Sequence, residues 1–279
     1  TAASLVEDGR RLLSNVISTS VKEQALYGGV VPEIASRRHC EFISATVKKA
    51  LLDAGKTMDD VDAVAVTFAP GLIGAVLVAV SFAKSVAYSL GVPLIPVHHI
   101  RGHIAANYLA FPDLEPPFLA LAISGGNTLI VDVKDYTDME ILGATRDDAA
   151  GECFDKVARV LGIGYPGGGP MDRLAQGGDE KKYQLPRAKV DGAPLDFSFS
   201  GLKTAALNLI HNAEQKGEAL DIPSLCAAFS KAVSDTLVPR TVQALRQTGY
   251  GKLAIAGGVA SNSALRAGMK EACEKDGIE

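Results

Sequence analysis

The chain has 279 residues, 47% of them hydrophobic and 22% charged, a composition typical of an ordinary globular protein. The formal net charge of −4 excludes a general electrostatic attraction to nucleic acid, so an RNA contact would need a partner protein or a local basic patch, for which the candidates are Lys181, Lys182, Arg187 and Lys189. The four cysteines occur singly, without a C-x-x-C pair, which favours reduced thiols in the cytoplasm over a zinc knuckle or a redox couple.

The sequence is not expected to contain a membrane span or a leader. Its longest apolar stretch, residues 71–80, is too short to cross a bilayer, and the start lacks the pattern of a signal peptide. The chain opens at Thr1 rather than at methionine, and it stops at Glu279, where a helix has ended and a strand could begin. We therefore expect an internal fragment of a longer protein.

The first part of the chain predicts a hairpin followed by helices alternating with strands. Gly55 and Gly91 are placed as helix ends, because glycine readily adopts the left-handed conformation found there. The expected elements are a hairpin of strands 2–6 and 12–17 with a turn at residues 7–9, a loop over 27–33, a helix over about 34–54, a strand over 61–68, a helix that follows Pro70 and ends at Gly91, a strand over 94–97, and a helix from Ile100.

The second part predicts a second mixture of strands and helices. The expected elements are strands 118–123 and 128–133 joined by a tight turn at 124–127, a strand over 139–144, a helix over about 148–161, irregular structure over 165–196, helices over 201–215 and 223–248, a strand over 252–256, and a helix starting near Ser261. This mixture indicates two α/β lobes, with residues 1–95 in the first and 96–279 in the second.

Three of the five histidines lie within six residues, at positions 98, 99 and 103. On a helix, the i, i+4 spacing of His99 and His103 places both side chains on one face, with Cβ atoms roughly 5–6 Å apart. Neutral imidazole is a common ligand of Zn and Fe(II), so the pair predicts a metal site. The alternative is one packed histidine and two solvated ones.

Three glycine-rich turns, at residues 124–126, 165–169 and 256–262, indicate a second kind of site. Glycine lets backbone approach a ligand closely, and N–H groups at turns suit phosphate oxygens. The turns therefore favour a nucleotide or acyl-phosphate pocket over plain turn chemistry. Neither the Walker pattern nor G-x-G-x-x-G after a strand occurs, which excludes the P-loop and Rossmann interpretations.

Four carboxylates, at positions 147, 148, 152 and 155, cluster at a predicted helix start. The first two are explained by the helix dipole, whereas Asp155 lies deeper and is the better candidate to accept hydrogen bonds from a ribose or another diol. Asn262 could either cap the last helix or bind a ligand, and the sequence leaves both open.

Seven segments, taken together and in this order, resemble the TsaD family of tRNA adenosine threonylcarbamoyltransferases, once described as sialoglycoprotein endopeptidases. They are YGGVVPE at 27–33, HHIRGH at 98–103, SGG at 124–126, GECFDK at 151–156, YPGG at 165–168, FSFSGLKT at 197–204 and GGVASN at 257–262. The resemblance implies an α/β, actin-like, two-lobed fold of the sugar kinase, Hsp70 and actin superfamily. It also implies transfer of a threonylcarbamoyl group from threonylcarbamoyl-AMP to N6 of the adenosine 3′ of the anticodon in tRNA.

The resemblance further assigns site residues and partners. By position, His99 and His103 match the ligands of one divalent metal, with Fe(II) expected in preference to Zn. TsaB-type and TsaE-type proteins are expected as partners, and no residue is assigned as general base. The positions that match substrate contacts are Ala122, Ile123, Ser124, Gly125, Gly126, Asp155, Gly168, Asp172 and Asn262.

The chain also departs from the family pattern. Asn127 stands where bacterial members often have His, Ala69 stands where Gly usually precedes Pro-Gly, and Gly169-Pro170 alters the usual Gly-Gly-Pro. The family's first strand and its third metal ligand, an Asp in a Thr-Asp-Asn segment, fall outside the chain. Activity of the chain alone is therefore not assured.

Two other functional classes compete with the transferase. A metal-dependent hydrolase is suggested by the paired histidines, but zinc proteases of the H-E-x-x-H type need a Glu where this chain has Ile100. A catalytically silent scaffold, like the shorter TsaB-type paralogues, would be indicated by loss of the metal pair. Retention of both histidines favours the enzyme.

Overall fold

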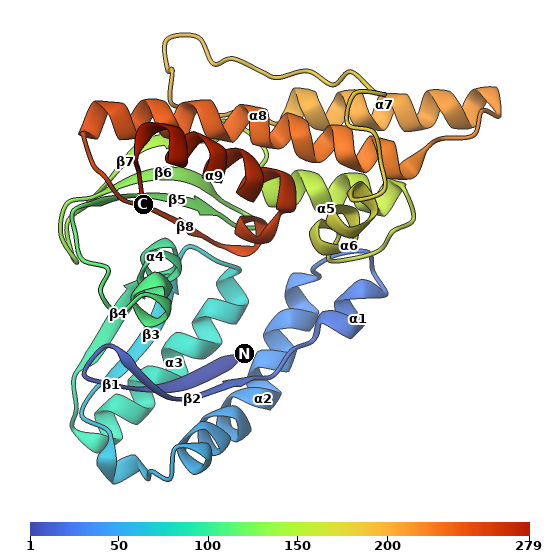
Figure 1. Cartoon of the computed structure of the whole chain (residues 1–279). Coiled ribbons are helices and arrows are strands. Elements are labelled where there is room, and N and C mark those ends of the chain that lie inside the picture. The colour runs from blue at the N-terminus through green and yellow to red at the C-terminus, as the bar shows by residue number, and fades with distance from the viewer. The chain divides into compact units, whose positions relative to one another are not determined.

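The computed structural model describes residues 1–279, which form two compact units, Thr1–Leu114 and Glu115–Glu279 (Figure 1). The sequence had placed this division between residues 95 and 96. Strand β4 (Leu94–His98) instead pairs in parallel with β3 (Val64–Ala69), and helix α4 (His99–Ala110) contacts both strands. The histidine segment therefore belongs to the first unit.

Unit 1 contains the predicted hairpin and two paired helices. Strands β1 (Ala2–Glu7) and β2 (Arg11–Ile17) are antiparallel, and Asp8 and Gly9 adopt the positive φ angles of 51° and 71° that close the turn. The hairpin packs on α2 (Pro32–Asp53), while β3 packs on α3 (Ile73–Leu90), which in turn contacts α2. The two short sheets thus lie on a pair of neighbouring helices.

Local hydrogen bonds explain two differences from the expected elements of unit 1. The strand expected from residue 61 begins at Val64, because the Val61 N–H donates to the Met58 carbonyl at 3.2 Å and so closes the short helix η1 (Met58–Asp60), which Thr57 and Asp60 start with a reciprocal capping box. A short helix that the sequence did not predict, α1 (Val21–Ala25), precedes the loop. The Gln24 side chain accepts a hydrogen bond from the Val31 N–H at 2.6 Å and holds this loop to α1.

Helix α3 is more apolar than the sequence analysis allowed. The apolar stretch of residues 71–80 is too short for a membrane span, but the helix continues to Leu90 with a mean hydropathy of 1.7 over 18 residues. By length and composition alone, it could cross a membrane. It packs here against α2, β3 and β4.

Unit 2 is built on a four-stranded mixed sheet with the order β7-β6-β5-β8. Strand β5 (Phe118–Ile123) runs antiparallel to β6 (Thr128–Val133) and parallel to β8 (Leu253–Ala256), and β7 (Met139–Ala144) flanks β6. All residues of β5 are buried, as its uninterrupted apolar sequence predicts for a central strand.

The helices of unit 2 are α5 (Ala150–Val160), α6 (Gly168–Ala175), α7 (Ser200–Lys216), α8 (Ile222–Thr248) and α9 (Ser263–Asp276), with a short helix η2 (Gly258–Ser261) before α9. Helix α6 corrects the expectation of irregular structure over residues 165–196. Its Gly-Gly-Pro start has a low helix propensity, and its N-cap residue, Gly167, is held by Asp155 on α5, which accepts the Gly167 N–H at 2.7 Å.

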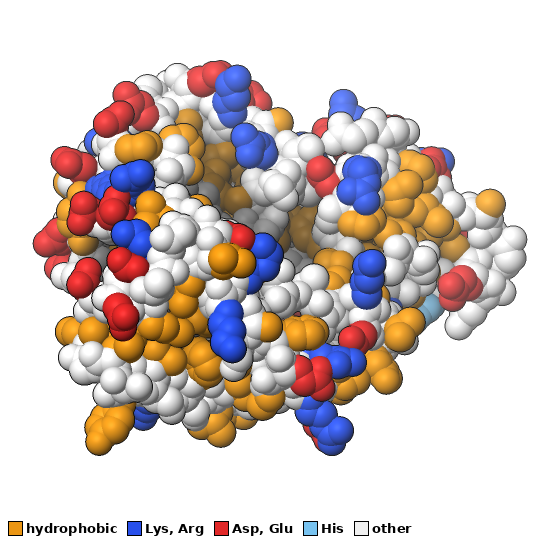
Figure 2. Space-filling model, turned by 90° about the horizontal axis from the view of Figure 1, so that it is seen from below, with side chains coloured by type: hydrophobic (Ala, Val, Ile, Leu, Met, Phe, Trp, Pro, Cys, Tyr) orange, Lys and Arg blue, Asp and Glu red, His pale blue; other side chains and the backbone are white.

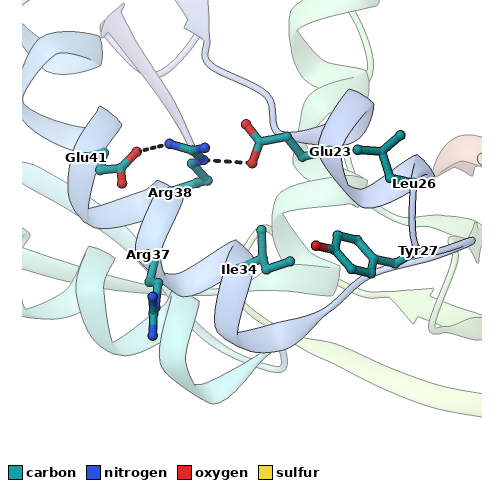
Figure 3. Close-up of a pocket in the computed structure, with 7 residues that line it drawn as sticks. All are labelled: Glu23, Leu26, Tyr27, Ile34, Arg37, Arg38 and Glu41. Carbon is teal, nitrogen blue, oxygen red and sulfur yellow. Dashed lines mark hydrogen bonds and ion pairs between the residues drawn. The ribbon is translucent and has the colours of Figure 1, made fainter.

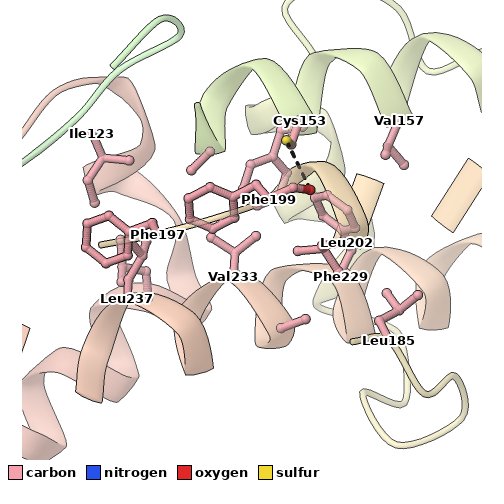
Figure 4. Packing of buried hydrophobic residues seen from close by; sticks show 14 of the residues in the cluster. Ile123, Cys153, Val157, Leu185, Phe197, Phe199, Leu202, Phe229, Val233 and Leu237 are labelled. Atoms are coloured by element: carbon pink, nitrogen blue, oxygen red, sulfur yellow. Dashed lines mark hydrogen bonds between the residues drawn. The ribbon is translucent and has the colours of Figure 1, made fainter. Parts of the chain in front are cut away.

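The core of unit 2 joins α5, α7 and α8 to the sheet (Figure 4). The rings of Phe154 and Phe229 meet edge to face with centroids 5.1 Å apart, and the Cys153 thiol donates to the Phe199 carbonyl at 3.8 Å. Burial raises the pKa of Cys153 to about 12, so this thiol stays protonated near neutral pH. Cys153 is therefore a packing residue rather than a nucleophile.

Candidate functional site

The candidate site of unit 2 lies at the edge where β5 and β8 end. These strands are parallel neighbours, with Ala122 paired to Ala256, so the chain leaves both of them at the same edge. Gly257 then approaches the backbone so closely that a Cβ there would lie 2.2 Å from the Ile123 carbonyl oxygen. The turns after the two strands consequently touch, as expected for a ligand-binding edge of an α/β sheet.

The turn after β5 is closed by its own residues. The Ser124 N–H donates to the Asn127 carbonyl at 2.8 Å, and the Asn127 N–H donates to Ser124 Oγ at 3.1 Å. Side chains added at Gly125 and Gly126 would meet no atom within 4 Å. This turn therefore presents bare, fixed backbone, which is the surface that a phosphate needs.

Helix α5 begins directly against this turn. A Cβ at Gly151 would lie 2.5 Å from the Ser124 carbonyl oxygen and 2.9 Å from the Gly125 Cα. The Ala150 N–H donates to the buried Thr128 hydroxyl at 3.0 Å. Neither Gly151 nor Thr128 is a site residue predicted from the sequence, although both stand inside or beside the quoted motifs.

Asp155 joins the turn at residues 165–168 to α5. Its carboxylate accepts the Gly167 N–H at 2.7 Å. Burial raises the pKa of Asp155, and the N–H groups of Gly167 and Gly168 oppose that rise. The carboxylate thus organises a glycine-rich turn, while its role as a ribose acceptor stays a prediction.

Asp172 and Asn262 fix the third turn, residues 257–262, to the start of α9. The Asp172 carboxylate accepts the Ser263 N–H and hydroxyl at 2.9 and 2.8 Å. Asn262 Oδ1 accepts the Leu265 N–H at 3.1 Å, so the side chain caps α9, one of the two roles that the sequence left open. Its role in ligand binding stays a prediction.

We call the turns at residues 124–127, 165–168 and 257–262 the turn cluster. Helix η2 of the third turn contacts both α5 and β5, so the first and third turns adjoin the same helix and strand. All the sequence-predicted substrate positions lie in or beside this cluster, within unit 2: Ala122, Ile123, Ser124, Gly125, Gly126, Asp155, Gly168, Asp172 and Asn262.

The paired histidines lie in unit 1, where β4 ends at His98 and α4 begins at His99. The Nε2 atoms of His99 and His103 are 3.1 Å apart, and their ring centroids are 4.4 Å apart. Burial lowers the pKa of both rings, and a second imidazole adds to this effect, that of His98 for His99 and that of His99 for His103. Both side chains are therefore neutral near pH 7, the form that binds metal.

This geometry fits two ligands of one metal ion. Metal–nitrogen bonds of about 2.0–2.1 Å at an angle between 90° and tetrahedral place two donor atoms roughly 2.8–3.4 Å apart. The Nε2 separation of 3.1 Å lies within that range. The structure contains no group of three or more His, Cys, Asp or Glu side chains that could hold a metal ion.

The basic patch expected for RNA, Lys181, Lys182, Arg187 and Lys189, is partly neutralised. Lys182 pairs with Asp221 and Arg187 pairs with Asp235, both at 2.6 Å. On the face drawn in Figure 2, Lys and Arg side chains are also interspersed with Asp and Glu. Positive charge is therefore distributed in mixed pairs rather than concentrated.

A groove of about 540 Å³ lies between α1 and α2 in unit 1, beside the YGGVVPE segment (Figure 3). Arg38 lies between the carboxylates of Glu23 and Glu41 and pairs with both. Tyr27 and Ile34 line the same groove. The charges of Glu23, Arg38 and Glu41 therefore satisfy one another, and the groove holds none of the predicted site residues.

Comparisons with a family model and with known relatives identify the same family. The TsaD family, described as tRNA N6-adenosine threonylcarbamoyltransferase, matches residues 11–279. A protein with that name from Clostridium botulinum is 50% identical over all 279 residues, which cover 82% of the relative. Another from Clostridium perfringens is 51% identical over the same extent.

Solved structures with similar folds are more distant. HypF from T. kodakarensis has a TM-score of 0.60 at 15% identity and covers 85% of this chain and 39% of its own. A full-length HypF in a phosphate- and nucleotide-bound form has a TM-score of 0.57 at 17% identity, with 79% and 43% covered. These likenesses concern the fold alone and agree with the predicted actin-like α/β fold.

Proposed function

Because the chain belongs to the TsaD family of tRNA N6-adenosine threonylcarbamoyltransferases, we propose that it binds threonylcarbamoyl-AMP at the turn cluster and uses it as the donor. The acceptor is N6 of an adenosine in tRNA, and we place it 3′ of the anticodon. The observation that carries the proposal is the meeting of bare glycine backbone at the edge where β5 and β8 end.

The reaction needs positioning more than activation. The adenosine amine attacks the carbamoyl carbon, a C–N bond forms, the C–O bond to the phosphate breaks, and AMP leaves while the amine loses a proton. The donor is already a mixed anhydride, so the protein must hold its phosphate and carbonyl in line with the amine. Fixed turns suit that task because they need no reorganisation during the reaction.

Each turn would take a separate part of the adenylate. The backbone of Gly125 and Gly126 is open to a phosphate, and Gly168 begins a helix whose first turn is held by Asp155. Asp155 would accept hydrogen bonds from the ribose while it also holds the turn. Asp172 and Asn262 would support the adenine side through the fixed start of α9.

We further propose that His99 and His103 hold one divalent metal, Fe(II) in preference to Zn. The support is the neutral imidazole pair with its Nε2 atoms 3.1 Å apart. A metal bound there supplies a Lewis acid for a carbonyl or phosphoryl oxygen. The third ligand would be the carboxylate that the family carries in its Thr-Asp-Asn segment.

Partner proteins of the TsaB and TsaE types complete the proposal. Phosphate neutralisation dominates most RNA binding and requires clustered Lys and Arg. This chain has a net charge of −4, and half of its expected patch is paired with carboxylates. The partners would therefore supply much of the positive surface for tRNA.

The two rival functions receive less support. A silent scaffold would not need to keep both histidines and all the predicted adenylate positions. A hydrolase of the H-E-x-x-H type would need a Glu next to the first histidine, and α4 has Ile100 there.

Reconstitution tests the proposed function. The chain and a version extended to the length of its relatives are each mixed with TsaB-type and TsaE-type partners, threonylcarbamoyl-AMP and unmodified tRNA. Nucleosides from the digested tRNA are then analysed by mass spectrometry. Threonylcarbamoyladenosine is expected with the extended version and partners. Its absence from every complete mixture would overturn the donor and partner assignments.

A further inference from the structure

We infer that Thr128 is a positioning residue of the reaction, whose buried hydroxyl fixes the start of α5 against the Ser124–Asn127 turn. This inference rests on the proposed adenylate site, because it concerns the backbone that would face the phosphate. Thr128 touches no substrate in this scheme and acts through the helix that it caps.

Helix α5 lacks a cap of its own. Its N-cap residue, Ala149, has no side-chain oxygen, and the first N–H groups of a helix have no partner within the helix. The Thr128 hydroxyl, from the neighbouring strand β6, accepts the Ala150 N–H at 3.0 Å. Thr128 has no solvent-exposed surface, so water does not replace this acceptor.

The backbone of Thr128 is fixed on both sides. It pairs with Ile123 at the end of the β5–β6 ladder, and its carbonyl accepts the Thr145 N–H at 3.0 Å. The hydroxyl therefore projects from a rigid point of the sheet, directly after the turn at residues 124–127. Helix α5 is tied through it to the residues that precede the turn and to those that follow β7.

Close packing passes any shift of α5 to the turn. Gly151, the next residue of the helix after Ala150, lies so close that even a methyl group would be 2.5 Å from the Ser124 carbonyl oxygen. If the helix start moves, Ser124 and Gly125 must move too. Thr128 thus determines where the bare backbone of the turn stands relative to the first turn of α5.

Three variants separate positioning from general stability. Thr128→Val keeps the shape but removes the acceptor, which leaves the Ala150 N–H buried without a partner. Thr128→Ser keeps the hydroxyl. Thr241→Val is the matched control, because Thr241 is equally buried in unit 2 and its hydroxyl donates to the Leu237 carbonyl at 2.9 Å, within α8.

The measurements are AMP binding by calorimetry and hydrogen exchange of peptides that cover residues 149–153. Thr128→Val is expected to weaken AMP binding at least tenfold and to speed exchange in that segment. Thr128→Ser is expected to stay within threefold of the unchanged chain, and Thr241→Val is expected to lower the melting temperature without changing AMP affinity.

The outcomes distinguish failure of the proposed adenylate site from failure of the positioning role of Thr128. If the unchanged chain binds no AMP, the proposed adenylate site is wrong, and hydrogen exchange alone still decides whether Thr128 clamps α5. If Thr128→Val binds AMP as the unchanged chain does, or if Thr241→Val weakens AMP binding equally, the positioning role of Thr128 is wrong.

Discussion

The carboxylate of Asp172 on α6 accepts both the N–H and the hydroxyl of Ser263, the first residue of α9, at 2.9 and 2.8 Å. Two hydrogen bonds to one ionised group are stronger than neutral ones, because each is assisted by charge. This single contact connects the helix after the second glycine-rich turn with the helix after the third.

Replacing Asp172 with Ala is expected to destabilise unit 2 by about 1.5–3 kcal/mol, the usual value of a hydrogen bond to a charged group. Urea unfolding followed by circular dichroism measures the change. Asp191→Ala is the control, because Asp191 is an exposed carboxylate in the same unit. Equal stability of the Asp172 and Asp191 variants would contradict the structural role of the contact.

Gly257→Ala is expected to cost at least about 2 kcal/mol, since the added Cβ combines backbone strain with a clash. Gly257 has a φ of +96°, and the Cβ would lie 2.2 Å from the Ile123 carbonyl oxygen. The adjacent Gly258→Ala is the matched control, because a Cβ there meets nothing within 4 Å. Thermal melting of both variants provides the comparison. A Gly258 variant as unstable as the Gly257 variant would disprove the steric explanation.

His99→Ala and His103→Ala are each expected to reduce the affinity for Zn(II) or Fe(II). The loss of affinity should exceed the roughly 10–100-fold loss that follows when residues hydrogen-bonded to metal ligands are replaced in other proteins. His211→Ala, which alters an exposed histidine on α7, serves as the control. The measurement is anaerobic calorimetric titration. A chain extended to include the third ligand should bind the metal more tightly than the unchanged chain. Metal binding that survives loss of either imidazole would exclude the pair as ligands.

The ionised carboxylate of Asp221 is expected to stabilise α8, and this stabilisation should be lost in acid, when the carboxylate is protonated. The Lys182 ammonium, and then the Ser224 hydroxyl and N–H, lower the pKa of Asp221 from 3.8 to about 2. A lowered carboxyl pKa means that the stabilisation is complete above the unfolded value and is lost as the pH falls through the folded value. The window therefore lies between about pH 4 and pH 2.

The test compares melting temperatures of the unchanged chain and Asp221→Asn at pH 7, 5 and 3. The difference should be the same at pH 7 and 5 and smaller at pH 3, because the Asn variant is neutral throughout. Glu180→Gln, a nearby exposed carboxylate, should show no such dependence. A difference that grows towards pH 3 would reverse the predicted sign.

Much of unit 2 could be predicted because its sequence periods are simple. Strand β5 reads as an unbroken apolar run and is buried throughout, and the tight turn with its returning strand appears as Ser-Gly-Gly-Asn followed by the mostly apolar segment Thr-Leu-Ile-Val-Asp-Val. Helix α6 could not be predicted, because its N-cap residue, Gly167, is held by an aspartate twelve positions earlier on another helix. Local sequence carries no sign of such a contact.

The candidate site, too, could be predicted only in part from the sequence. Spacing alone placed His99 and His103 on one helical face, and the Nε2 atoms do meet at 3.1 Å. By contrast, nothing in the sequence shows that the carboxylates of Asp155 and Asp172 accept hydrogen bonds from the N–H groups of Gly167 and Ser263. Carboxylates that look like ligand groups also hold the turns in place, and that distinction depends on tertiary contacts.

The parallel pairing of β5 with β8 has a consequence for the order of events during synthesis. The turn that begins at Ser124 is made early, but its packing partner Gly257 follows β8, near the end of unit 2. Contacts between residues so distant in sequence form slowly, because a long loop must close first. A nascent chain that already contains Ser124 therefore does not yet have the finished edge where β5 and β8 end. It can acquire this edge only after nearly the whole of unit 2 has left the ribosome.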